Sequence, residues 1–91
     1  MEFEWDENKR LANLKKHGID FLEVKSIFYD PYKVVEIDDK KDYGEIRANT
    51  IGNFKNTIIV AVAHTDRNGI TRIISARRAS KKERSSYYGN R

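Results

Sequence analysis

The sequence is organised around residues 57–77, which read TIIVAVAHTDRNGITRIISAR. Two runs rich in β-branched residues, 57–65 and 70–76, lie on either side of the pair Asn68-Gly69. Asn-Gly between two such runs is a strong hairpin signal, because both residues tolerate the positive φ angles of a tight turn. The stretch therefore predicts two antiparallel strands joined by a two-residue loop.

Two more strands are predicted before this hairpin. Residues 45–54 end at Lys55-Asn56, which has the composition of a short turn, and a brief β-branched run covers residues 34–37. If Lys55-Asn56 is also a two-residue loop, Arg47 lies directly opposite His64. The three strands from residue 45 to residue 76 then form an antiparallel meander.

The loop lengths also decide which side chains share a face of the sheet. With two-residue loops, His64 pairs with Ile73 and Val60 pairs with Arg77, which places Arg47, His64 and Arg77 on one open face. The other face carries small and apolar residues and is predicted to pack against helices. A three-residue loop or a bulge would reverse this assignment.

Helices are predicted before and after the strands. After a short strand at residues 3–5, Asp6 is placed to cap a helix ending at His17-Gly18, and Asp20 begins a second helix that reaches about residue 28. Ser80 and Glu83 form a capping box for a last helix. The order predicts an α+β fold with an antiparallel curved sheet, two N-terminal helices and one C-terminal helix, all packed on one face. The apolar side chains expected to face the sheet are Leu11, Leu14, Phe21, Val24 and Phe28.

Composition limits the classes of function. A chain of 91 residues predicts a single domain over residues 1–91. It has no Cys and only two His, which excludes disulfides and thiolate zinc sites and predicts neither a metal site nor a cofactor. No apolar run is long enough to span a membrane, and the acidic start is unlike a secretory signal, so we expect a cytoplasmic protein.

Positive charge is concentrated at the C-terminal end. Residues 67–91 hold eight basic and one acidic residue, a net charge of +7, whereas residues 1–45 hold eight basic and twelve acidic residues, a net charge of −4. Such a segment attracts a polyanion, and nucleic acid is the commonest polyanion in a cell. The alternative is a solvated helix face.

Metal-free RNA cleavage needs a proton-transfer group and cations that neutralise the phosphate. His64 titrates near neutral pH, and arginine binds phosphate bidentately, so Arg47, His64 and Arg77 are the candidate catalytic residues. Glu45 and Tyr87 are reserve proton-transfer groups. The candidate substrate-binding residues are Arg72, Arg78, Lys81, Lys82, Arg84 and Tyr87. For the tyrosine, the alternative is packing against the sheet.

Several short motifs resemble the BrnT family of type II toxins, and together they cover nearly the whole chain. They are Phe3-Glu4-Trp5-Asp6, Lys9, Asn13, Lys16-His17-Gly18-Ile19, Phe21, Gly44-Glu45-Ile46-Arg47, His64-Thr65, Arg72-Ile73-Ile74-Ser75-Ala76-Arg77-Arg78-Ala79, Glu83-Arg84 and Tyr87. The resemblance implies a RelE-like fold and an endoribonuclease that inhibits translation by cleaving mRNA, free or on the ribosome. It also implies neutralisation by a BrnA-type antitoxin with a ribbon-helix-helix domain, and repression of the operon by the complex, which contacts operator DNA only through the antitoxin. We expect structural roles for Trp5, Asn13 and His17.

Two other functions fit the charge pattern. A non-catalytic module would bind nucleic acid through the basic segment and leave it intact. Alternatively, the same segment is a docking surface for an acidic or apolar partner, which is compatible with a toxin that its antitoxin blocks.

Overall fold

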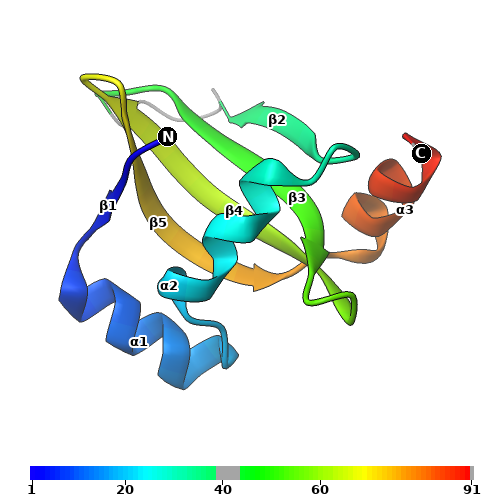
Figure 1. Ribbon diagram of the computed structural model, residues 1–91, viewed down its shortest axis with the longest axis horizontal. Coiled ribbons are helices and arrows are strands. Elements are labelled where there is room, and N and C mark those ends of the chain that lie inside the picture. The colour runs from blue at the N-terminus through cyan, green and yellow to red at the C-terminus, as the bar shows by residue number, and fades with distance from the viewer. Residues whose placement is uncertain (39–43, 91) are drawn as a thin grey trace.

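The computed structural model describes residues 1–38 and 44–90 as an α+β fold (Figure 1). Every predicted helix and strand is present, with boundaries shifted by a few residues. The second helix continues as a 3-10 turn, η1, and residues 39–43 of the polar connection after β2 lie outside the described residues. The elements are β1 (Phe3–Trp5), α1 (Glu7–His17), α2 (Phe21–Val24), η1 (Lys25–Tyr29), β2 (Val34–Asp38), β3 (Arg47–Phe54), β4 (Ile58–Arg67), β5 (Ile70–Arg78) and α3 (Lys81–Gly89).

The five strands form one sheet in the order β1-β5-β4-β3-β2. The predicted antiparallel meander is correct for β3, β4 and β5, and β2 adds to it antiparallel. β1, however, lies parallel to β5, so the sheet is mixed rather than antiparallel.

The turn between β3 and β4 differs from the prediction by one residue. Lys55 and Asn56 have φ angles of 54° and 55°, and Thr57 N donates to Phe54 O at 3.0 Å, as in a tight turn. Pairing nevertheless resumes only at Ile58, which lies opposite Phe54. The extra residue, Thr57, rotates all of β4 to the opposite face relative to β3.

The hairpin between β4 and β5 begins as predicted and then changes register. Its two-residue turn and the pairing of His64 with Ile73 are confirmed. A bulge then follows, so that Ala61 rather than Val60 lies opposite Arg77. A bulge of one residue moves the rest of the strand to the other face.

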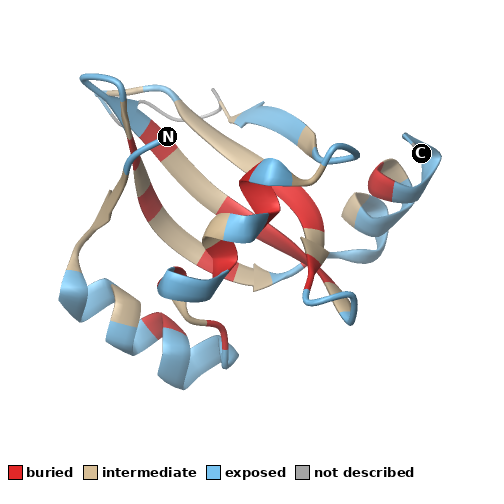
Figure 2. Cartoon of the chain, viewed as in Figure 1, coloured by how far each residue is buried: buried red, intermediate tan, exposed pale blue. Residues whose placement is uncertain are grey.

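Helices cover both faces of the sheet, not one. Phe21, Val24, Ile27 and Phe28 of α2 and η1 pack on the face of Val60, Val62 and Ile73, forming the larger core. On the opposite face, α3 contributes Tyr87 to a second cluster with Ile51, Ile59, Ala61 and Ala79. Figure 2 shows the buried positions concentrated in the central strands and in the helical segment that crosses them.

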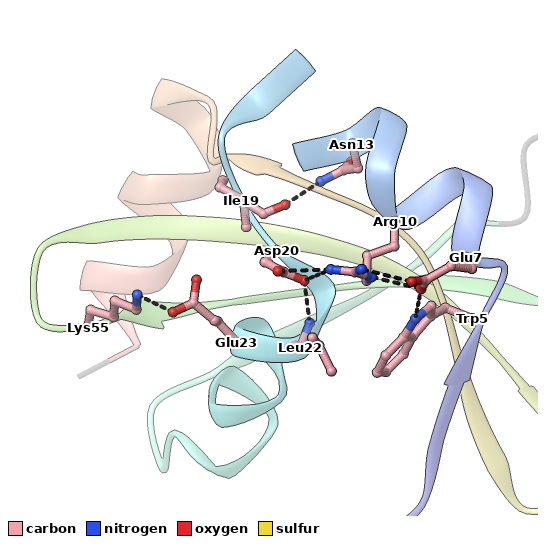
Figure 3. Close-up of polar contacts among 9 residues, drawn as sticks. All are labelled: Trp5, Glu7, Arg10, Asn13, Ile19, Asp20, Leu22, Glu23 and Lys55. Carbon is pink, nitrogen blue, oxygen red and sulfur yellow. Dashed lines mark hydrogen bonds and ion pairs between the residues drawn. The ribbon is translucent and has the colours of Figure 1, made fainter. Parts of the chain in front are cut away.

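Helix α1 meets the sheet through a polar residue, not through the predicted leucines. Leu11 and Leu14 are 51% and 38% exposed, whereas Asn13 is 7% exposed. Asn13 Nδ2 donates to the carbonyls of Ile19 (3.0 Å) and Ala76 (2.9 Å), and its Oδ1 accepts from Ala76 N at 3.1 Å (Figure 3 draws the Ile19 bond). The amide thus pairs with the edge of β5 beyond the point where β1 ends.

Ion pairs tie the helices to one another and to the sheet. Arg10 bonds Glu7 of its own helix and Asp20 at the start of α2, and Lys55 of the β3–β4 turn pairs with Glu23 (Figure 3). Trp5 packs on Phe21 with ring centroids 6.3 Å apart, which confirms its structural role. Within the described ranges, no helix is long and apolar enough to cross a membrane.

Candidate functional site

Arg47, Arg72 and Arg77 share the sheet face that α3 partly covers. Arg47 and Arg72 both lie opposite Thr65 of β4, one from each side, and Arg77 lies opposite Ala61. Thr65 and Ala61 are four residues apart on one strand, so their side chains point to the same face. The prediction that Arg47 and Arg77 share a face is confirmed, and Arg72 lies on the same face.

His64 lies on the opposite face, so its predicted place beside Arg47 and Arg77 is wrong. Its partner on β3 is Ala48. Its ring packs against Phe28 at 4.9 Å between centroids, and its Nε2 lies 2.7 Å from Thr50 Oγ1. Burial lowers the pKa of the imidazole, and the charge of Asp66 only partly opposes this. The side chain is therefore a neutral, packed group near pH 7.

An open pocket of about 520 Å³ lies where β2, β3, β5 and the start of α3 meet. We call it the Arg77 pocket. Among its lining residues, Arg77 and Lys82 are basic, Glu36, Asp38 and Glu83 are acidic, and Asn49 and Ser80 are neutral and polar. A concave site with several convergent polar groups is where a ligand is expected to bind.

Glu83 holds Arg77 at the rim of this pocket. The two side chains form a bidentate pair with distances of 2.7 and 3.0 Å. Glu83 also accepts from Ser80 N at 2.8 Å in the capping box of α3, so one carboxylate joins the end of β5 to the helix. The bonds from Arg77 lower the pKa of Glu83 to about 2 and raise that of Arg77, so both stay charged at neutral pH.

A second charged group lies at the other end of the arginine face. Arg67 bonds Glu45 at 3.1 and 3.2 Å, and this pair, with the charges of Arg47 and Arg72 nearby, holds the pKa of Glu45 below its usual range. Arg72 also donates to Glu4 of β1 at 3.1 Å. Glu45 is thus ionised near pH 7, which suits a base better than an acid.

The backbone positions place Arg77 too far from Arg47 and Arg72 for all three side chains to bind one phosphate. The row of Arg47 and Arg72 is separated from the row of Arg77 by four residues of β4. At 3.3–3.4 Å per residue this is about 13 Å. The face therefore presents successive cationic positions, as a strand with several phosphates requires.

The remaining predicted binding residues occupy different places. Lys82 lines the Arg77 pocket, Lys81 and Arg78 are exposed, and Arg84 donates to Ala79 O at 2.9 Å. Tyr87 is only 2% exposed, and its hydroxyl donates to Asp30 at 2.7 Å. Its ring packs in the core, so the structure does not offer it as a stacking surface.

The sequence reasoning missed Glu36, Asp38 and Asn49 as pocket residues. A signal was present, because Glu36 and Asp38 alternate with Val35 and Ile37 at the period of a strand. The alternation alone did not say to which face of the sheet the carboxylates belong. That depends on the pairing of β2 with β3, in which Glu36 lies opposite Asn49.

Comparisons with known proteins agree with this architecture. Residues 5–83 match the family model described as the ribonuclease toxin BrnT of type II toxin-antitoxin systems. The 1.1 Å crystal structure of the Brucella abortus ribonuclease toxin BrnT is similar with a TM-score of 0.69 and 32% sequence identity, covering 89% of this chain and 99% of that one. A search of curated proteins found no significant match. Because the family model spans most of the chain and the structural match spans nearly all of the Brucella toxin, this protein belongs to the BrnT family of ribonuclease toxins of type II toxin-antitoxin systems.

Proposed function

We propose that this toxin is a metal-independent endoribonuclease that cleaves mRNA and so inhibits translation. The observation that carries the proposal is Arg77, held by Glu83 at the rim of an open pocket on the face that also presents Arg47 and Arg72. Glu83 and the Arg78 carbonyl take three of the five N–H donors of Arg77, so two donors remain for a phosphate, and the charged guanidinium neutralises the developing charge at phosphorus.

In this reaction the 2′-hydroxyl loses its proton to a base and its oxygen bonds to phosphorus. The bond from phosphorus to the 5′-oxygen breaks, and that oxygen gains a proton, leaving a cyclic phosphate and a 5′-hydroxyl. We assign the contact with the reacting phosphate to Arg77, a neighbouring phosphate of the same strand to Arg47, and proton transfer to the β2 carboxylates that line the Arg77 pocket. Arg72 and Lys82 bind the flanking strand.

The antitoxin of this system is proposed to be of the BrnA type, with a ribbon-helix-helix domain through which the complex represses its operon. This follows from the family resemblance. The cytoplasm, where mRNA is translated, is the proposed site of action.

The decisive experiment compares Arg77→Ala with Arg78→Ala. Arg78 is the neighbouring arginine, pairs with Val60 of the opposite face and does not line the Arg77 pocket. Expression without antitoxin is expected to arrest growth, Arg77→Ala to relieve the arrest, and Arg78→Ala to keep it. Purified protein should cleave RNA in the presence of EDTA. RNA that is retarded on a gel but stays intact would support the non-catalytic binding module instead.

A second variant tests the reassignment of proton transfer. His64→Gln is expected to retain cleavage, because His64 faces away from the arginines. If a folded His64→Gln protein binds RNA normally but no longer cleaves it, the carboxylate assignment is wrong.

A further inference from the structure

A second pocket, of about 350 Å³, lies between the η1–β2 turn, the end of β3 and the C-terminal half of α3. We call it the Tyr29 pocket. Besides the buried Tyr87, two exposed aromatic side chains line it, Tyr29 and Tyr32, which are 64% and 44% exposed. Asn53 and Asn56 add side-chain amides to its wall. Figure 1 shows the C-terminal end of α3 beside the turn that leads into β2.

The wall of this pocket is fixed by Asp30. Its carboxylate accepts from Tyr32 N (2.8 Å), Asn53 N (2.9 Å) and the Tyr87 hydroxyl (2.7 Å), which joins the turn to β3 and α3. At the other end of the turn, Asn90 Nδ2 donates to Tyr32 O at 3.2 Å. Hydrogen bonds from the η1–β2 turn to β3 and α3 therefore fix the backbone that carries Tyr29 and Tyr32.

The chemistry of the lining selects a neutral, planar ligand. None of the described residues that line the pocket is basic, so it has no cation for a phosphate. The Asp30 carboxylate is already engaged by three donors. Tyrosine faces and asparagine amides are the groups with which proteins stack and hydrogen-bond unpaired RNA bases.

The Tyr29 pocket and the Arg77 pocket are close enough for one RNA strand to reach both. Glu83 and Tyr87, which line one pocket each, are one helical turn apart on α3, about 6 Å along its axis. Asn49 and Asn53, likewise one in each pocket, are four residues apart on β3, about 13 Å. Phosphates of a stacked strand are about 3.4 Å apart along its axis and further apart when the strand is extended, so a few nucleotides cover the span.

We propose that the Tyr29 pocket binds a nucleobase of the RNA strand whose phosphate occupies the Arg77 pocket, and so contributes to the choice of cleavage site. This inference rests on the proposed ribonuclease function. It assigns base recognition to the η1–β2 turn, and not to Tyr87.

The test combines a titration with mapping of cleavage sites, both on the full chain. Adenosine, guanosine, cytidine and uridine are titrated while backbone amide NMR signals are followed, with inorganic phosphate as a separate probe. At least one nucleoside is expected to shift Asn53, Asn56 and Tyr32, whereas phosphate shifts signals of the Arg77 pocket. If no nucleoside shifts the Tyr29 pocket, the inference is overturned.

The variant Tyr29→Ala/Tyr32→Ala is then compared with Tyr88→Ala, an exposed tyrosine of α3 that does not line this pocket. Stacking of one base is worth about 5- to 150-fold in affinity, so the double variant should bind RNA that much more weakly and lose base preference near the cut. Tyr88→Ala should behave as the unmodified protein. An unchanged affinity and cleavage pattern in the double variant, or loss of antitoxin binding alone, would refute base recognition.

The two proposals fail in different ways. If the unmodified toxin cleaves no RNA, the proposed function is wrong, whatever the nucleosides do. If it cleaves RNA and the double variant does so with the same affinity and the same preference, only the nucleobase pocket is wrong.

Discussion

Replacing Asn13 with Ala should destabilise the toxin more than an alanine at any other position of α1. The amide makes three hydrogen bonds, to Ala76 N, Ala76 O and Ile19 O, and the side chain is buried. Without it, one backbone N–H and two carbonyls lose their partners, at about 1–3 kcal/mol for each group that stays unsatisfied. The better helix propensity of Ala returns about 0.5 kcal/mol.

The net loss is about 2–4 kcal/mol in the free energy of unfolding, because water reaches some of these groups. For a domain of this size that corresponds to a fall in Tm of roughly 10–30 °C. Urea titration and thermal melts measure both quantities. Asn8→Ala is the matched control, since Asn8 is exposed on the same helix and should change stability by less than about 0.5 kcal/mol. If Asn13→Ala costs no more than Asn8→Ala, the amide does not hold the edge of β5.

Three further changes are predicted. Gly52→Ala places a Cβ 2.5 Å from Ile27 Cγ2, so it should cost about 1–3 kcal/mol in urea titrations, and a variant of unchanged stability would show that η1 can move away. Glu83 has a folded pKa of about 2 against an ordinary 4.5, so its stabilisation is present above pH 4.5 and is lost as pH falls toward 2; Glu83→Gln should flatten the stability profile over that range by about 1–2 kcal/mol, and an unchanged profile would contradict the pairing with Arg77. Leu11→Ala should change the free energy of unfolding by no more than about 0.5 kcal/mol, because Leu11 is half exposed. A loss of about 2 kcal/mol or more in urea titrations would restore its predicted packing role.

The sequence was sufficient for the elements because their signals are local. Asp6, Asp20 and Ser80 cap the helices that they were predicted to cap, and Asn68-Gly69 forms the expected turn. The prediction that Leu11 and Leu14 of α1 face the sheet was wrong. Asn13 faces it instead, because this polar residue hydrogen-bonds backbone groups of β5 that no apolar side chain can satisfy.

The site was harder to predict because it depends on counting residues across two turns. Thr57 adds one residue between β3 and β4, and the bulge adds one to β5. Each shift reverses a face, and for Arg77 the two reversals cancel, which is why it rejoins Arg47. His64 follows the extra residue Thr57, and its partner on β5, Ile73, precedes the bulge. Only one reversal therefore applies to His64, which leaves it on the face opposite Arg47 and Arg77. Neither extra residue carries a sequence signal that separates it from an ordinary strand residue.

The pairing of Asn13 with β5 has a consequence for solubility. A sheet edge with unpaired N–H and carbonyl groups is a template on which other chains can add as strands. β1 covers β5 only as far as Ile73, and Asn13 occupies both backbone groups of Ala76 beyond it. The side-chain amide of Asn13 thus prevents another chain from pairing with β5 at this point. Loss of Asn13 should therefore promote aggregation through β5 as well as unfolding.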